Sequence, residues 1–355
     1  MRIAVVGLGL IGGSIALAAR ARAGAVVSGW DADAGALTAA VDRGALDRPA
    51  ASIADAVQGA EAVFVAVPVG ALVPTVEAVL EHAPAGCVVT DVGSTKRAIV
   101  AAVADQRFVG GHPLAGAETA GIGNARADLF EGATWYLTPT AISSGVLFER
   151  LHRLLGTVGA RPTAIEAATH DSMLALVSHL PHVFANVLVG QAAGALGVEG
   201  EPLPATGPSF RDATRVAGAP SAIWTDIYLS NHDALVAAID EAVARLRDVR
   251  DALAREDAEA ITAWNDAAAG QRRRLLEADL TGGDLRELRV SVPNRPGVVA
   301  RIALELGRAG VNIADLALYA APDMSEGVVA FWVGGAHAPR ALAIIEALGF
   351  PVAQA

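Results

Sequence analysis

Gly7-Leu8-Gly9-Leu10-Ile11-Gly12 stands between an apolar run, Ile3 to Val6, and an apolar segment of helical character. A G-x-G-x-x-G spacing between a strand and a helix is typical of dinucleotide-binding domains. The first glycine permits a tight turn, the second lets backbone N–H groups approach a pyrophosphate, and the third lets helix and strand pack closely. The helix N-terminus favours the phosphate charge. We therefore expect cofactor contacts at Gly7, Gly9, Leu10, Ile11 and Gly12.

An acidic residue supports this interpretation. A second predicted strand ends at Trp30-Asp31, and Asp31 lies 19 residues after Gly12, near the roughly 20 residues typical of such domains. Its carboxylate is expected to accept hydrogen bonds from the adenosine ribose. Because a carboxylate repels a 2′-phosphate and no arginine follows directly, the sequence favours NAD over NADP. The alternative is a glycine turn in an α/β domain that binds no nucleotide.

The first 166 residues alternate short apolar runs with helical segments, which predicts βαβ units and a mostly parallel, doubly wound Rossmann-type sheet. The first four predicted strands are Ile3 to Val6, Ala25 to Gly29, Ala62 to Val67 and Cys87 to Val92. Three further strands are predicted at Arg107 to Gly110, Trp135 to Thr138 and Thr163 to Glu166.

Residues 167–281 have a different pattern, with long stretches at helical spacing and no convincing strand. This pattern predicts an all-α domain. Leu174 to Leu196 is apolar on nearly every face, so we expect it to be buried on all sides. We expect a partner subunit to cover part of this helix, so that the chain forms a homodimer.

The pair Gly282-Gly283 indicates a linker to a third domain, of the α+β class, at residues 284–355. A strand at Leu288 to Val292, a turn at Pro293 to Gly297, a helix to about Arg308 and a strand from Val311 predict the order βαββαβ.

Composition narrows the class of protein. The 355 residues exceed one ordinary domain of about 150 residues, and a net charge of −11 argues against nucleic-acid or anionic-membrane surfaces. One cysteine, Cys87, excludes an internal disulfide and fits a reducing compartment. The glycine turn follows Met1 too closely for a signal peptide, and the two most apolar stretches contain too many polar or proline residues for a good membrane span. We expect a cytoplasmic protein.

Two segments follow predicted strands and carry reactive side chains: Asp91-Val92-Gly93-Ser94-Thr95-Lys96 and Gly110-Gly111-His112-Pro113-Leu114-Ala115-Gly116-Ala117-Glu118. In an open parallel sheet, ligands bind beyond the carboxyl ends of the strands. His112 can accept a proton near neutral pH. The alternative is a loop histidine without a chemical role, but Pro113 and the nearby glycines favour a shaped, pre-organised loop.

These segments, together with Val177-Ser178-His179-Leu180-Pro181-His182 and Phe210-Arg211-Asp212-Ala213-Thr214-Arg215, closely resemble the prephenate dehydrogenase family over about residues 1–280. The resemblance implies that His112 is the catalytic base and that Ser94 positions it together with the substrate hydroxyl and the nicotinamide. It further implies substrate contacts for four residues of these segments, Arg215, His182, Glu118 and Asp212. No metal is expected, and His179 is expected only to pack.

The implied reaction is the oxidative decarboxylation of prephenate to 4-hydroxyphenylpyruvate, in tyrosine biosynthesis. His112 would take the proton of the ring hydroxyl while C4 gives a hydride to NAD, and loss of carbon dioxide makes the ring aromatic. Arg215 suits a carboxylate of this dicarboxylate substrate because a guanidinium can bond both oxygens. Ala117 stands where some relatives carry threonine, which leaves the substrate preference open.

The C-terminal segments Val292 to Gly297 and Gly310-Val311-Asn312-Ile313 resemble the ACT domain, a regulatory module that often binds amino acids. The resemblance implies effector contacts for Asn294 and Asn312. Val292 replaces a histidine of some serine-binding members, so tyrosine is the effector that fits the pathway. A module that only dimerises is the alternative.

Three other functions share features with this sequence. An arogenate or cyclohexadienyl dehydrogenase would share the ring, the hydroxyl and the C1 carboxylate. A hydroxyacid dehydrogenase would often use a lysine of its helical domain, whereas the only lysine here is Lys96. A non-catalytic, NAD-binding amino-acid sensor would give His112, Ser94 and Arg215 no reason to converge.

Overall fold

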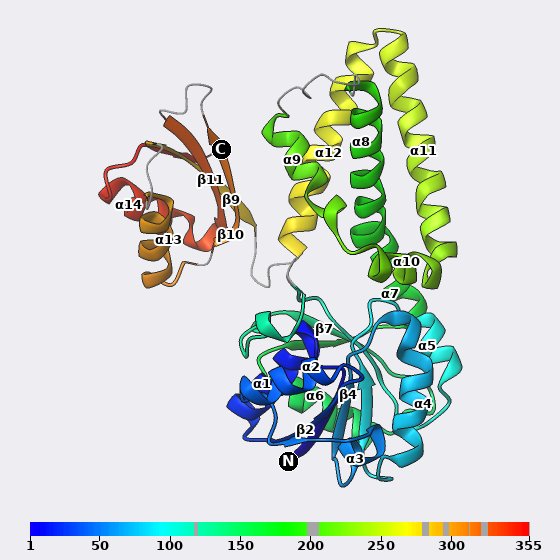
Figure 1. Ribbon diagram of the computed structural model, residues 1–355. Helices are drawn as coiled ribbons and strands as arrows, with labels where there is room; N and C mark the ends of the chain where they lie inside the picture. Colours follow the sequence, from blue (N-terminus) through cyan, green and yellow to red (C-terminus); the bar gives the residue numbers. More distant parts are fainter. Residues whose placement is uncertain are drawn as a thin grey trace. The chain divides into compact units, whose positions relative to one another are not determined.

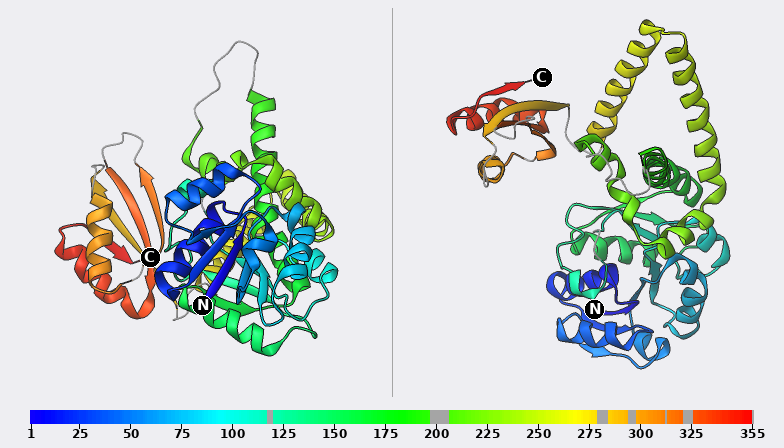
Figure 2. Two further views of the ribbon diagram at one scale, coloured as in Figure 1. Left: turned by 60° about the horizontal axis from the view of Figure 1, so that its bottom comes forward. Right: turned by 45° about the horizontal axis from the view of Figure 1, so that its top comes forward.

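The computed structural model describes residues 1–116, 120–196, 206–278, 284–293, 298–311, 313–320 and 326–354. It divides into two compact units, residues 1–244 and 245–355 (Figures 1 and 2). We describe each unit by itself.

A five-stranded parallel sheet forms the centre of the first unit, in the order β3-β2-β1-β4-β5. Its strands are β1 (Arg2–Val6), β2 (Val26–Trp30), β3 (Arg48–Pro49), β4 (Ala62–Val65) and β5 (Val88–Asp91). The apolar runs of β1, β4 and β5 are buried on both faces, as parallel strands covered by helices must be. The predicted strands in this region are confirmed, and β3 was not predicted.

Helices cover both faces of this sheet (Figure 1). One face packs in a single core with α1 (Leu10–Ala23), α2 (Ala34–Asp42) and α6 (Gly145–Thr157). The other packs with α3 (Ile53–Val57), α4 (Leu72–His82), and α5 (Arg97–Ala102), with the short helix η1 (Val69–Ala71) leading into α4. The predicted doubly wound arrangement is therefore confirmed.

A second sheet contains β6 (Gly110–Pro113), β7 (Thr134–Thr138) and β8 (Arg161–Ala164), with η2 (Ile122–Asn124) between β6 and β7. Strand β6 is antiparallel to β7, which is parallel to β8. The strand predicted at Arg107 to Gly110 was misplaced: only Phe108 bridges to β5, and the paired strand begins at Gly110. The strand predicted at Thr163 to Glu166 begins earlier, at Arg161.

Helices follow, and the described residues between 167 and 278 contain no strand, which confirms the all-α prediction. One long helix is built from α7 (Ala167–Leu174), a π-helical turn η3 (Ala175–His179) and α8 (Leu180–Leu196). The remaining elements are α9 (Pro208–Thr214), η4 (Arg215–Gly218), α10 (Ser221–Ser230), α11 (His232–Ala254) and α12 (Ala258–Ala278). The division between the two units falls inside α11.

The long apolar helix is exposed on part of its surface within one chain, so the expected burial on all sides stays a prediction that involves a partner subunit. Val177 is 62% exposed and Val187 is 54% exposed. The length and composition of Ala167–Ala195 also satisfy the criteria for a helix that could cross a membrane. Those criteria are weak evidence for one helix, because core helices of soluble proteins meet them too.

The second unit contains the strands β9 (Leu285–Pro293), β10 (Ile313–Ala320), β11 (Glu326–Gly334) and β12 (Val352–Gln354), with α13 (Val298–Arg308), η5 (Gly335–His337) and α14 (Ala338–Ala347). The chain order is βαββαβ, as predicted, and the antiparallel sheet has the order β10-β11-β9-β12. Residues of β9 alternate between the two faces, so that Leu288, Val290 and Val292 pack under the two helices.

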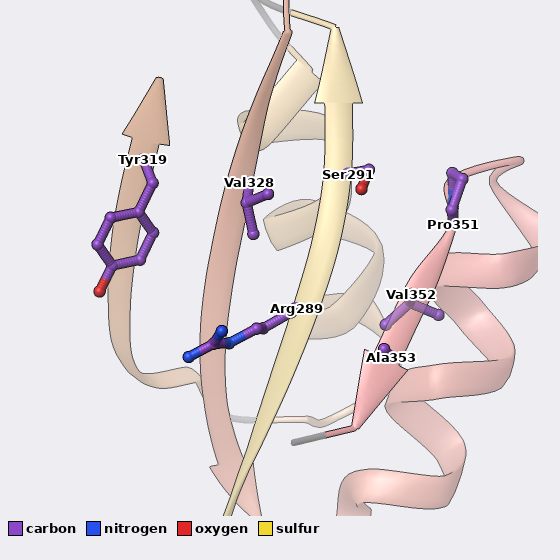
Figure 3. A pocket seen from close by; sticks show the side chains of 7 residues that line it. All are labelled: Arg289, Ser291, Tyr319, Val328, Pro351, Val352 and Ala353. Atoms are coloured by element: carbon purple, nitrogen blue, oxygen red, sulfur yellow. The ribbon is translucent and has the colours of Figure 1, made fainter. Parts of the chain in front are cut away.

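The opposite face of this sheet carries a hollow (Figure 3). It is lined by Arg289, Ser291, Tyr319, Val328, Pro351, Val352 and Ala353. On α12, the Arg272 guanidinium lies 5.4 Å from the Trp332 ring centroid of β11, a cation–π distance.

Candidate active site

The glycine turn between β1 and α1 has the geometry that a bound pyrophosphate requires. Gly7 has a φ of 92°, a backbone conformation that favours glycine. A Cβ at Gly12 would lie 1.9 Å from the Gly7 carbonyl oxygen, so the close packing of helix on strand excludes any side chain there. A Cβ at Gly9 would meet nothing within 4 Å, which leaves open space above the turn. Leu10 and Ile11 form the first turn of α1 and are half-buried.

Asp31 follows β2 at the same edge of the sheet. The Leu8 N–H donates to its Oδ2 at 2.6 Å, and the Asp33 N–H donates to its Oδ1 at 2.8 Å. The carboxylate is thereby fixed beside the glycine turn. The open space at Gly9 and this acidic group fit a dinucleotide with a free ribose 2′-hydroxyl, which is NAD.

His112 lies on β6, near the carboxyl end of the neighbouring strand β5. Its side chain is 8% exposed. Gly111 lets the backbone approach β5 closely, because a Cβ there would lie 2.6 Å from the Asp91 carbonyl oxygen. Burial holds the pKa of His112 well below its ordinary value of 6.5, with smaller effects of His170 and Lys96. The ring is therefore unprotonated, and able to accept a proton, at neutral pH.

A buried ion pair anchors the loop after β5. The Asp91 carboxylate accepts hydrogen bonds from the N–H groups of Gly93 (2.8 Å) and Gly111 (3.0 Å), and it pairs with the Lys96 ammonium. Both charged side chains are fully buried, and burial lowers the pKa of Lys96 while Asp91 opposes the shift. This carboxylate therefore joins the loop to the strand that carries His112.

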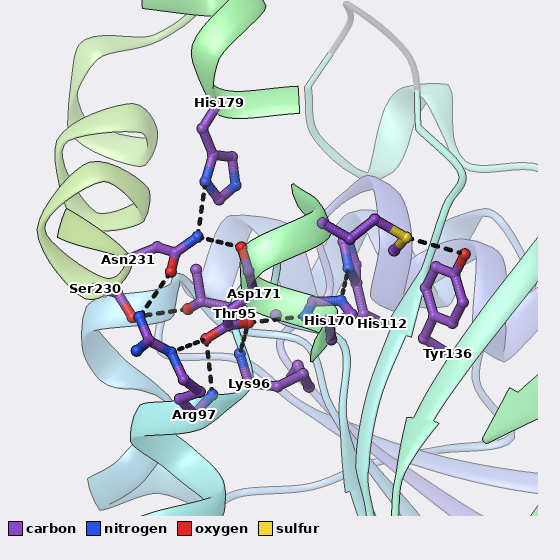
Figure 4. Close-up of polar contacts among 12 residues, drawn as sticks. Thr95, Lys96, Arg97, His112, Tyr136, His170, Asp171, His179, Ser230 and Asn231 are labelled. Carbon is purple, nitrogen blue, oxygen red and sulfur yellow. Dashed lines mark hydrogen bonds and ion pairs between the residues drawn. The ribbon is translucent and has the colours of Figure 1, made fainter. Parts of the chain in front are cut away.

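The helical segment contributes a second set of polar contacts (Figure 4). His170 and Asp171, on α7, are fully buried, and His170 Nε2 lies 2.8 Å from His112 Nδ1. Arg97 binds the side chains of Asn231 and Asp233. The Thr95 and Ser230 hydroxyls are 2.7 Å apart. No motif in the sequence predicted this network. The adjacent His-Asp pair was its only local signal, and such a pair in a helical stretch usually faces solvent.

Ser94 is half-buried in the same loop, between Gly93 and Thr95. Among the described residues, the hydrogen bonds do not join Ser94 to His112; the ring nitrogen of His112 is bonded to His170 instead. The contact to this ring therefore comes from a residue of the helical segment, and the role expected of Ser94 remains a prediction.

His182 lies on α8, stacked on Trp224 with ring centroids 3.6 Å apart. Its Nδ1 is 2.6 Å from the Tyr228 hydroxyl. Burial lowers the pKa of His182, and the Val216 backbone partly opposes this shift. His179 is also buried, with Nδ1 at 3.2 Å from the Asn231 amide nitrogen.

Arg215 and Asp212 lie on η4 and α9 and are exposed. Both elements pack against α8, the helix that carries His182. Glu118 falls outside the described residues, as do Asn294 and Asn312. The structure therefore joins His112 to α7, and the predicted substrate contacts remain predictions.

A doubly wound domain with a dinucleotide turn, a buried unprotonated histidine at the carboxyl edge of its strands and an appended helical segment defines the class of pyridine-nucleotide dehydrogenases. Two family models match the chain: the nucleotide-binding domain of prephenate dehydrogenase at residues 15–164 and its dimerisation domain at residues 166–265. The chain belongs to the prephenate dehydrogenase family.

Individual relatives agree with this assignment. A prephenate dehydrogenase of Bacillus subtilis (strain 168) is 33% identical over 326 residues, which are 88% of this chain and 87% of the relative. A cyclohexadienyl dehydrogenase of Zymomonas mobilis is 35% identical over 72% of this chain and 89% of the relative.

Solved structures of the family are also similar. The prephenate dehydrogenase of A. aeolicus, in complex with hydroxyphenyl propionate and NAD⁺, superposes with a TM-score of 0.73 at 29% identity, covering 78% of this chain and 98% of that one. The Synechocystis arogenate dehydrogenase superposes with a TM-score of 0.69 at 30% identity, over 78% of this chain and all of that one.

Proposed function

We propose that the chain is an NAD-dependent prephenate dehydrogenase, which converts prephenate to 4-hydroxyphenylpyruvate in tyrosine biosynthesis. The observation that carries the proposal is the position of His112, buried and unprotonated at the carboxyl edge of the strands. Family membership supports the reaction type.

Each residue has a task in this reaction. Gly7, Gly9 and Gly12 hold the pyrophosphate, and Asp31 holds the ribose. NAD, when bound, supplies the acceptor for the hydride from ring C4. His112 takes the proton of the C4 hydroxyl. Loss of carbon dioxide from C1 then makes the ring aromatic, so orientation and proton acceptance are the main work of the protein.

The remaining substrate contacts are assigned by the resemblance to the family. We propose that Arg215 binds a substrate carboxylate in a bidentate manner, which gives this acidic protein a local cation for a dianion. His182, Asp212 and Glu118 would complete the substrate site, with Ser94 near the reacting hydroxyl.

Replacement of His112 with asparagine tests the base. Turnover should fall by about 10² to 10⁴-fold because proton acceptance is lost, while NAD binding survives. The rate of NADH formation and the quenching of protein fluorescence by NADH measure the two effects separately. Unchanged turnover would remove His112 from this role.

The choice of substrate is open to a direct assay. Arogenate differs from prephenate only in the side-chain amino group, and similar proteins include enzymes named for either substrate. NADH absorbance measured with each substrate, and with NADP in place of NAD, gives the preference. An absence of turnover with both substrates would favour the non-catalytic sensor.

We propose the division into a Rossmann-type domain (1–166), a helical substrate and dimerisation domain (167–281) and an ACT domain (284–355). The βαββαβ order of the last part supports the ACT assignment, with Asn294 and Asn312 as effector contacts. Tyrosine is the proposed effector, and its addition to the NADH assay should lower the rate.

We further propose a cytoplasmic homodimer. Exposed apolar side chains on η3 and α8, such as Val177, Val187 and Leu188, support a partner subunit on this helix. The family description of residues 166–265 as a dimerisation domain agrees. The relatives named above are biosynthetic enzymes, which supports the cytoplasm.

A further inference from the structure

Three buried side chains form a chain of hydrogen bonds that begins at the proposed base (Figure 4). His112 Nδ1 lies 2.8 Å from His170 Nε2. His170 Nδ1 lies 2.8 Å from Asp171 Oδ1. His170 and Asp171 are fully buried, so no bulk water competes for these bonds.

Asp171, at the far end of this series of hydrogen bonds, is held by two backbone amides. The N–H groups of Lys96 and Arg97 donate to the two oxygens of Asp171 at 2.8 and 2.9 Å. Burial opposes ionisation of Asp171, but the hydrogen bonds from His170 and these two amides outweigh it and hold its pKa below the ordinary value. Asp171 is therefore a carboxylate, which can only accept hydrogen bonds.

The protons of both rings follow from that carboxylate together with a neutral His170, which is the state that the proposal assigns to it. Since Asp171 only accepts, His170 must carry its proton on Nδ1. A neutral His170 then has a lone pair on Nε2 and can only accept from His112, so His112 must carry its proton on Nδ1. The lone pair of His112 is left on Nε2, the nitrogen that this chain of bonds does not use.

We propose that His170, held by Asp171, is a positioning residue that selects the Nδ1–H tautomer of His112 and so presents Nε2 as the proton acceptor. The inference deepens the proposed function, since it assigns an orienting partner to the same base. It also explains why α7 is tied to the loop after β5: the amides of Lys96 and Arg97 hold Asp171, and Asp171 holds His170.

Other charged groups around the pair are already engaged. Lys96 is paired with Asp91, and the Arg97 guanidinium is bound to Asp233. Arg97 Nε also lies 3.4 Å from Asp171 Oδ2, which favours the carboxylate form of Asp171. His179 Nδ1 accepts from the Asn231 amide nitrogen at 3.2 Å, and the same amide donates to the Asp171 carbonyl oxygen at 2.8 Å. Tautomer selection therefore rests on the carboxylate of Asp171.

Two replacements of His170 separate positioning from mere packing. His170→Leu removes the acceptor, and kcat should fall by about 10²-fold with the substrate KM little changed. His170→Gln keeps an amide oxygen for His112 Nδ1–H and an N–H for Asp171, and should remain within about tenfold of the original kcat. His82→Gln, on an exposed histidine at the end of α4, is the matched control.

Equal kcat values for His170→Leu and the unaltered protein would overturn the proposal, as would a His170→Gln variant no better than His170→Leu. A second measurement does not depend on the folding of any His170 variant. Two-bond ¹H–¹⁵N correlation spectra of the unaltered protein should show His112 protonated at Nδ1, with the signal assigned by its loss in His112→Asn.

Protonation at Nε2 instead would sink the inference regardless of turnover. Failure of the proposed function has a different signature, because the unaltered protein would then form no NADH while the tautomer could still be measured.

Discussion

Four of the eight histidines in the chain, His112, His170, His179 and His182, are buried in the first unit. A buried imidazole without full solvation is more easily kept neutral than charged. Burial lowers the pKa of His179 to about 4, against a smaller opposing effect of Asp171. The His179 ring therefore connects the stability of the fold to pH.

The direction in which the free energy of unfolding changes with pH follows from the lowered pKa of His179. Between pH 6.5 and about 4, an unfolded His179 binds a proton that the folded one does not, so the free energy of unfolding should fall as pH falls through this window, by about 3 kcal/mol at most for this residue. His179→Asn, which keeps a polar partner for Asn231, should flatten that dependence. Urea unfolding followed by tryptophan fluorescence measures it. The same slope in His179→Asn and in the control His82→Gln would contradict the assignment.

Sequence alone identified His112 because its segment is conspicuous, with glycines and proline around one histidine. It did not identify His170, whose bond to His112 spans 58 positions. That contact depends on how α7 packs against the loop after β5, which no local pattern encodes. For the same reason no motif predicted His170 as a contact of His112.

Among the elements, the β1–α1 turn was predictable because its constraints are local: a positive φ at Gly7 and a close contact at Gly12 can each be met only by glycine. The start of strand β6 was predicted too early in the sequence, because what makes it a strand is not local. Arg107 to Val109 has the apolar character of a strand, whereas Gly110 to Pro113 does not. Gly110 to Pro113 is a strand because it pairs with β7, Gly110 with Thr138 and His112 with Tyr136.

The glycine turn allows packing and ligand binding to be separated. Gly12→Ala should destabilise the fold, because its Cβ would overlap the Gly7 carbonyl oxygen. Gly9→Ala should keep the thermal midpoint, since its Cβ meets open space, yet weaken NAD binding by filling the position of the pyrophosphate. Differential scanning fluorimetry with and without NAD measures both. An unchanged NAD affinity in Gly9→Ala would place the cofactor elsewhere.

At the scale of the whole molecule, helical spacing in the sequence correctly indicated a helical middle. It could not show which faces of the long helix stay uncovered, because an apolar pattern is the same for a core helix and for one that meets a partner. Val177 and Val187 are exposed in the single chain although their neighbours Leu174 and Ala185 are buried.

A charge on this helix tests the partner subunit. Val187→Glu should convert a dimer to a monomer, because an unpaired carboxylate would be buried at the subunit interface. Val146→Glu is the matched control, since Val146 is 70% exposed on α6 in the Rossmann-type domain. Light scattering after size-exclusion chromatography gives the mass of each. A dimer that survives Val187→Glu would place the interface on another surface.

The bond between His112 and His170 also sets an order of events. The hydrogen bonds described for the glycine turn and Asp31 lie within the first 33 residues of the chain, and none of them involves α7. The base, by contrast, acquires its orientation only when α7 has docked. During recovery from denaturant, the ability to hold NAD should therefore return before turnover does, and the lag between the two is the time that the helical segment takes to settle onto the sheet.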